Sequence, residues 1–225
     1  MLAAVLLASL AAAPTGAYAQ VGAGTGGARQ RYERQTKGAN IDDFVKRLGS
    51  DDPAKRLEAV KSLGATKDKK AVEYLLQATG DPDVRVRAKA VQMLGDMRAS
   101  EATPVLVQYL SQRTTEPRMK QLIIASLGKI GDPEAARPII EFLHRDLDQE
   151  LRGTAIFALG EIAAPESAGE LQQIASNDQD ERIRQLAADA LAKVQHSQAA
   201  KSKEAKGPTN TFLKPDEDQP PRPQE

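Results

Sequence analysis

The feature that most constrains this chain is a leucine that recurs five times at steps of 31 to 33 residues. An acid stands eleven positions before each leucine and a base stands seven positions before it. Repeats with a period of about 20 to 50 residues are typical of solenoids and arrays. The leucines are Leu63, Leu94, Leu127, Leu159 and Leu191, the acids are Asp52, Asp83, Glu116, Asp148 and Asp180, and the bases are Arg56, Arg87, Lys120, Arg152 and Arg184.

The spacing of these columns predicts a helix. The base, two small or aliphatic residues and the leucine fall on one helical face. The acid precedes this face and suits the N-cap, where a carboxylate accepts free backbone N–H groups. The glycine that follows four of the leucines fits either a left-handed helix end or a close approach of two helices. A second apolar column, about twelve residues after each leucine, indicates a partner helix and therefore a helical hairpin: Leu75, Leu106, Ile139 and Leu171.

Stacked hairpins would share one core, because two short helices cannot bury their apolar faces alone. We therefore predict an all-α solenoid of about five hairpins over residues 40–196. The acid, base, small-residue and Leu-Gly columns resemble the HEAT-repeat superfamily, above all the short HEAT-like repeats of phycobilisome lyases. This resemblance implies that the second helix of each hairpin lines the concave side. It does not define a function, because the repeat hosts many unrelated roles.

The segments outside the repeats predict export. Residues 1–19 hold an uncharged apolar run that ends in Ala17-Tyr18-Ala19, which matches a signal-peptidase site and predicts cleavage after Ala19. No base precedes this run, so either translation starts upstream or the signal is atypical, and the alternative is an alanine-rich tail. Residues 20–39 would form a flexible basic linker and 197–225 a disordered charged, proline-rich tail. We expect a periplasmic or secreted protein with no membrane span in the mature chain.

The base column has two interpretations. Each base lies at the edge of the apolar face, one turn after the acid of its own repeat. Acid–base contacts between stacked units would align the repeats through charge-assisted hydrogen bonds. The alternative is an anion-binding or active site. We favour the structural ladder, which the resemblance also supports.

The sequence offers little material for catalysis. It has two histidines, His144 and His196, no cysteine and no paired His-Glu motif, so we expect no metal site and no cofactor. The iron-binding hydroxylases among HEAT-like proteins depend on such motifs, and their activity is not transferred to this chain. The 31 basic and 31 acidic residues balance, which argues against nucleic-acid binding.

A binding surface remains the most plausible site. Positions that flank or oppose the apolar face of the second helices are polar in the first two repeats, with Arg85 and Lys89 nearby, whereas the last three repeats offer four apolar residues there. An exposed apolar patch on a solenoid often marks a partner site. The alternative is that the two leucines of the patch pack against neighbouring helices and only Phe157 is exposed. The predicted apolar residues are Leu122, Ala125, Phe157 and Leu186.

Together these patterns predict an exported, non-catalytic scaffold or adaptor that binds an unknown protein partner through its concave face. We expect it to be a monomer. The alternative is an enzyme, or an accessory protein of an enzyme, of the HEAT-like lyase type. A stoichiometric metal ion would favour that alternative.

Overall fold

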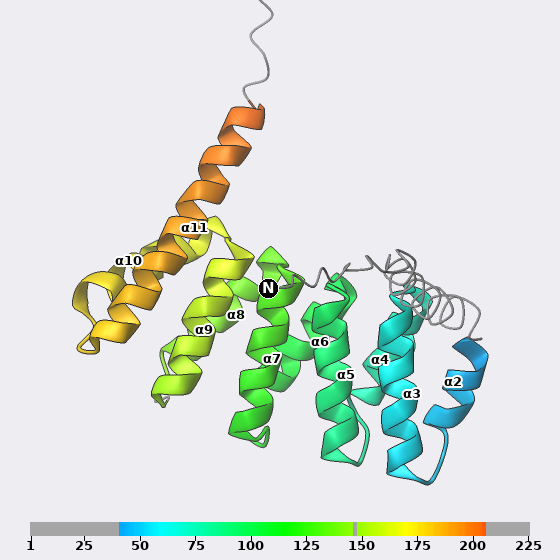
Figure 1. Cartoon of the computed structure of the whole chain (residues 1–225). Helices are drawn as coiled ribbons and strands as arrows, with labels where there is room; N and C mark the ends of the chain where they lie inside the picture. The colour runs from blue at the N-terminus through cyan, green and yellow to red at the C-terminus, as the bar shows by residue number, and fades with distance from the viewer. Residues whose placement is uncertain (1–40, 146–147, 206–225) are drawn as a thin grey trace, which may run out of the picture.

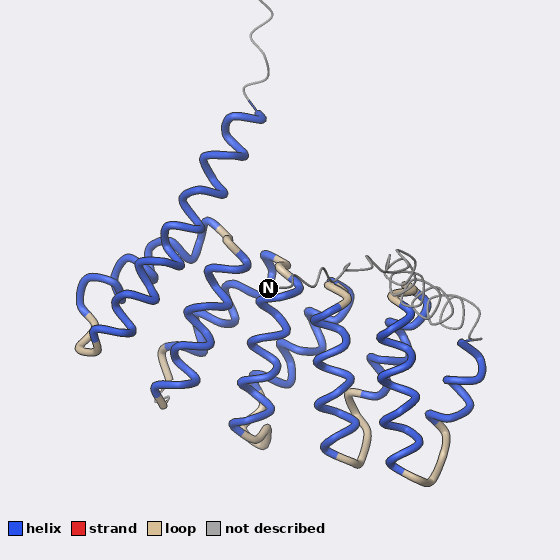
Figure 2. Tube along the Cα trace, in the orientation of Figure 1, coloured by secondary structure: helices blue, strands red, loops and turns tan. Residues whose placement is uncertain are grey.

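The computed structural model describes residues 41–145 and 148–205, and there every regular element is a helix (Figures 1 and 2). The helices alternate as five pairs, which confirms the predicted all-α solenoid. The predicted signal peptide and linker, with the end of the tail, lie outside the described residues. The pairs are α2 (Ile41–Leu48) with α3 (Pro53–Thr66), α4 (Lys70–Ala78) with α5 (Val84–Asp96), α6 (Thr103–Ser111) with α7 (Pro117–Ile130), α8 (Ala136–Leu143) with α9 (Gln149–Ile162), and α10 (Ala168–Asn177) with α11 (Glu181–Ala205).

The second helices of the pairs form a continuous layer. Helices α3, α5, α7, α9 and α11 contact one another in that order, and each first helix packs on its own second helix. Single turns of 3-10 helix precede α6, α8 and α10: Ser100–Ala102, Pro133–Ala135 and Pro165–Ser167. The loops that lead into the second helices all lie along one edge of the array, the lower edge in Figure 2. Features of those loops are therefore brought into a row.

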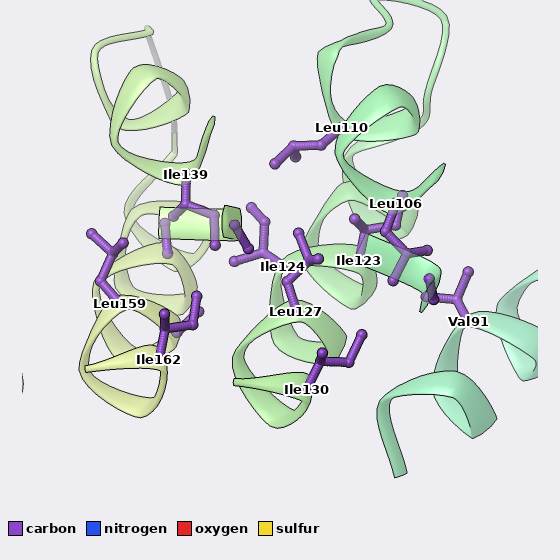
Figure 3. Close-up of a cluster of buried hydrophobic side chains, with 14 of the residues drawn as sticks. Val91, Leu106, Leu110, Ile123, Ile124, Leu127, Ile130, Ile139, Leu159 and Ile162 are labelled. Carbon is purple, nitrogen blue, oxygen red and sulfur yellow. The ribbon is translucent and has the colours of Figure 1, made fainter. Parts of the chain in front are cut away.

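The predicted leucine columns form the core. All five leucines of the second helices and all four apolar residues of the partner column are buried. Figure 3 shows Ile124 and Leu127 of α7 between Val91 and Leu106 on one side and Ile139 and Leu159 on the other. The small or aliphatic residues three and four positions before each leucine are buried as well, except that Ala188 is exposed in the last repeat. No further repeat follows α11 among the described residues to cover it.

The glycine of each Leu-Gly pair lies inside its helix, and its role is close packing. A Cβ atom added at Gly160 would stand 2.9 Å from the Cα of Ala190, and one at Gly128 would stand 3.0 Å from the Cα of Ala158. Each glycine thus faces the residue that precedes the leucine of the next repeat. The second helices can approach this closely because glycine has no side chain there.

Left-handed residues do end several second helices, but they lie three positions after the glycine. Gly131 (φ 74°) caps α7, and Lys67 and Ala163 (both φ 52°) cap α3 and α9. At the other end, four of the five predicted N-cap acids accept a backbone N–H, which confirms their role: Asp52, Asp83, Asp148 and Asp180. The fifth, Glu116, makes no such bond.

Helix α11 continues to Ala205, so residues 197–205, the start of the predicted disordered tail, are helical. The segment after 196 is rich in alanine and lysine, both good helix formers, and the prolines begin only at Pro208. In the described residues, no helix is both long and apolar enough to cross a membrane.

Candidate functional site

A row of ion pairs runs along the edge where the loops enter the second helices. Arg56 of α3 holds the carboxylate of Asp81 with two hydrogen bonds, from Nε at 2.7 Å and from Nη2 at 2.9 Å. Its Nη1 donates to the backbone carbonyls of Ser50 and Asp51. The Arg56 and Asp81 side chains are only 12% and 9% exposed, so this bond joins two repeats largely out of contact with water.

The same arrangement recurs between the last two repeats, where Arg152 of α9 is hydrogen-bonded to Asp178. In both cases the carboxylate also accepts the backbone N–H of the next cap acid: Asp81 from Asp83 at 2.8 Å, and Asp178 from Asp180 at 2.9 Å. A single carboxylate therefore stabilises the turn that contains it and also binds the arginine of the preceding repeat.

The contacts between stacked units thus exist, but the acids in them are not the ones predicted. Four of the five predicted acids are occupied as N-caps, and the acids that bind the arginine of the preceding repeat lie two positions before the predicted ones. This second column, thirteen residues before each leucine, is acidic in three of the five repeats, and its role becomes clear only from these contacts. It reads Ser50, Asp81, Thr114, Asp146 and Asp178.

The remaining bases differ among themselves. Arg184 donates from Nη1 to the carbonyls of Asp178 and Gln179, as Arg56 does in its own turn. The Nζ of Lys120 lies 6.0 Å from the centre of the Phe142 ring. The acid that would face Lys120 is Asp146, which lies outside the described residues.

The ion pairs shift the carboxyl groups toward the charged form. The hydrogen bond from Arg56 holds the pKa of Asp81 below its ordinary value. Burial raises the pKa of Asp178, but hydrogen bonds from the Asp180 backbone and from Arg152 outweigh burial and lower it. Asp83 is bound by the side chain and the backbone N–H of Arg85, and these bonds lower its pKa to about 2.

The row of ion pairs is interrupted at Arg87, because the third repeat has Thr114 where the second and fourth repeats have an acid. Its Nη1 donates to the carbonyls of Asp81 and Pro82, at 2.8 and 3.0 Å, but Nε and Nη2 make no hydrogen bond to any described residue. A pocket of about 240 Å³ lies beside it, between α5, α6 and α7. Its walls combine hydroxyl groups with apolar side chains, including Thr79, Tyr109, Thr114, Val84 and Met119.

The second candidate surface centres on Phe157 of α9. Its side chain is 51% exposed, and among the described residues only Val84 is another large apolar residue exposed to a similar degree. The Nζ of Lys193 lies 4.9 Å from the Phe157 ring centre. Phe157, Leu186 and Lys193 line a hollow of about 310 Å³ between α9 and α11, together with Gly160, Asp189 and Ala190.

The other predicted residues of the groove are not part of this hollow. Leu122 and Leu186 are half-buried against the core, in agreement with the alternative in which only Phe157 is exposed. Ala125 is half-buried on α7, and of the six only Phe157 and Leu186 meet. Arg85 pairs with Asp83, and Lys89 donates to Gln92. No pattern in the sequence indicates Lys193, whose position depends on how α9 and α11 pack.

Neither histidine lines either of the two hollows. His144 is exposed and lies 3.4 Å from Glu170. Within residues 41–145 and 148–205, no group of three or more histidine, aspartate or glutamate side chains is arranged to hold a metal ion.

Stacked helical hairpins with one continuous core define this chain as an α-solenoid. A family profile described as HEAT repeats matches residues 41–116, 80–142 and 136–202, which together span most of the chain. The chain therefore belongs to the HEAT-repeat family. No curated protein sequence matches it.

Solved structures with a similar fold include HEAT-like and armadillo-type proteins. The complex of CpcE and CpcF of phycocyanin lyase from Nostoc sp. PCC7120 aligns with a TM-score of 0.57 and 21% identity, over 74% of this chain and 69% of that one. Human deoxyhypusine hydroxylase in complex with glycerol aligns with a TM-score of 0.51 and 21% identity, over 73% and 66%. A designed armadillo repeat protein aligns with a TM-score of 0.50 and 16% identity, over 73% and 86%. At these identities the likeness concerns the fold alone.

Proposed function

We propose that this protein is an exported, non-catalytic adaptor that binds a protein partner around Phe157. The observation that carries the proposal is the exposed ring of Phe157 beside the hollow between α9 and α11. An exposed aromatic side chain next to a cavity is a typical anchor point in protein interfaces, where aromatic residues supply much of the binding energy.

The surroundings of Phe157 favour a partner with both apolar and charged groups. Leu186 offers an apolar wall, whereas Lys193 and Asp189 present opposite charges at the rim. Lys193 is also paired with Glu161, so its charge is partly compensated. A rim of charged residues around an apolar centre matches the usual composition of transient interfaces.

Site-specific photo-crosslinking in the producing cells tests the surface. A photoreactive phenylalanine analogue at position 157 should form one dominant crosslinked product with another protein. The same analogue at position 137, where Arg137 is 84% exposed on α8, serves as the control and should give none. Equal crosslinking at both positions, or none at 157, would remove the support for this surface.

Export and the absence of catalysis need separate measurements. Cell fractionation with sequencing of the mature N-terminus should find the chain outside the cytoplasm and beginning at Gln20. Metal analysis of the purified mature chain should find no stoichiometric iron or zinc. A cytoplasmic full-length chain would refute export, and a stoichiometric metal would favour the alternative of an enzyme or its accessory protein.

A further inference from the structure

Arg87 and Arg56 stand at equivalent positions in consecutive repeats, and they share one set of bonds. Each donates from Nη1 to two backbone carbonyls in the loop before its own helix. These two bonds restrain the guanidinium plane and leave its other edge for a further partner. For Arg56, that edge, made of Nε and Nη2, binds both oxygens of the Asp81 carboxylate.

The corresponding edge of Arg87 binds no acid among the described residues. Thr114 occupies the position of Asp81 in the repeat, and Arg87 lines a pocket of about 240 Å³. No described residue accepts a hydrogen bond from its Nε or Nη2, although the Arg87 side chain is half-buried. A half-buried guanidinium edge held in a fixed plane is well suited to a planar carboxylate, which it binds with two parallel hydrogen bonds.

We propose that this pocket binds a carboxylate, held by Nε and Nη2 of Arg87 as Asp81 is held by Arg56. Tyr109 and Thr114 also line the pocket, and each carries a hydroxyl group that can act as a donor to the same anion. Val91, Met119 and Ile123 provide an apolar wall for the rest of the ligand.

The volume limits the size of the ligand. Pockets for drug-sized molecules usually measure roughly 300–1,000 Å³, so a pocket of about 240 Å³ suits a short aliphatic acid or the last residue of a peptide. Both sources present the same chemistry, a carboxylate joined to a small apolar group. Glu116 also lines the pocket and is exposed, so it disfavours ligands that carry further negative charge.

Chemical-shift titration of the mature chain by NMR, with butyrate and its neutral amide butyramide, tests the proposal. Butyrate should shift the signals of Arg87 and of the α6–α7 loop, with an affinity at least about tenfold above that of butyramide, since charge-assisted hydrogen bonds distinguish the two. An acetylated dipeptide with a free C-terminus, compared with its C-terminal amide, distinguishes the sources. Tighter binding of the peptide acid than of butyrate indicates a peptide terminus, and equal or weaker binding indicates a free acid.

The decisive variant is Thr114→Asp, which supplies the missing carboxylate and retains Arg87. It should abolish butyrate binding, whereas the matched neutral variant Thr114→Asn should bind butyrate within about threefold of the native chain. Glu116→Gln should strengthen binding, because it removes a negative charge from the pocket. Equal binding of butyrate and butyramide, no binding of either acid, or unchanged binding by Thr114→Asp would each overturn the proposal. The pocket does not involve Phe157, so its failure would leave the proposed adaptor surface untouched.

Discussion

The carboxylate of Asp81 is bound by the side chain of Arg56, while the backbone carbonyl of the same residue is bound by Arg87. One residue therefore connects the arginines of two successive repeats. The loop before α5 is fixed from both sides, and the stacking of α3 on α5 is fixed with it. Charge-assisted hydrogen bonds of this kind require a defined geometry, so the link favours one position of α3 against α5.

The Asp81 link predicts a pH-dependent contribution to stability. The hydrogen bond from Arg56 lowers the pKa of Asp81 in the folded state below the unfolded value of about 3.9. The contribution is therefore complete above that unfolded value and is lost as the pH falls through the folded-state pKa. Asp81→Asn should be less stable than the native chain at pH 7, and this difference should shrink at about pH 3. Urea unfolding at several pH values measures it.

Asp96→Asn provides a control for that experiment. Asp96 also pairs with a base of a neighbouring repeat, Lys129 at 2.7 Å, but both side chains are largely exposed. Exposed pairs contribute little because water and salt screen them, so this variant should match the native chain at pH 7. If both variants lose equal stability, the Arg56–Asp81 pair stabilises the fold no more than an exposed ion pair does.

The fold followed from the sequence because its signals are local. The apolar period and the capping aspartates each act within one helix or one hairpin, and both appear in the structure. The ion pairs are decided between repeats, by how far one hairpin is shifted against the next. A column of residues on one helix does not show which acid of the next repeat Arg56 reaches. In the structure Asp83 serves as an N-cap, and Arg56 binds Asp81 instead.

The sequence indicates the candidate surfaces only through residues that differ from the repeat pattern. Phe157 was predicted because lysine, glutamine, alanine and aspartate hold its column elsewhere. Thr114 is an exception of the same kind, but its column becomes meaningful only once the contacts of Asp81 are known. Lys193 does not depart from any repeat pattern, and its contact with Phe157 depends on the packing of α11 against α9.

The helix-interior glycines should not tolerate a side chain. In Gly160→Ala, the new Cβ would lie 2.9 Å from the Cα and the Cβ of Ala190, and backbone cannot move aside as a flexible side chain can. We expect a loss of about 1–3 kcal/mol in the free energy of unfolding. Thermal and urea unfolding of the purified variant would measure this loss.

Gly169→Ala in α10 is the matched control, because nothing lies within 4 Å of the added Cβ. It should leave stability unchanged or raise it by up to about 1 kcal/mol, since alanine is the better helix former. Equal effects of the two substitutions would show that Gly160 does not govern the distance between α9 and α11.

Leu127 at the centre of α7 should be among the residues most sensitive to truncation. It is fully buried in the middle repeat, in a core shared with the helices on both sides. Leu127→Ala should lower the free energy of unfolding by about 2–5 kcal/mol, through lost burial and the cavity that remains. Val84→Ala, at a residue 44% exposed, should change it by less than about 0.5 kcal/mol. A loss below about 0.5 kcal/mol for Leu127→Ala would mean that the repeat register is wrong.

Phe157→Ala should separate binding from stability. Half of the side chain is exposed, and its contact with Lys193 is of a kind worth about 0.5–1 kcal/mol at an exposed site. We therefore expect Phe157→Ala to decrease the melting temperature only slightly. With the photoreactive group moved from position 157 to position 186, the same variant should lose most of the crosslinked product. Lys193→Ala removes the same contact and keeps the ring, so it should resemble Phe157→Ala in stability but retain more of the crosslink. A loss of several kcal/mol in Phe157→Ala would instead identify Phe157 as part of the core, and the hollow between α9 and α11 would no longer be a candidate for partner binding.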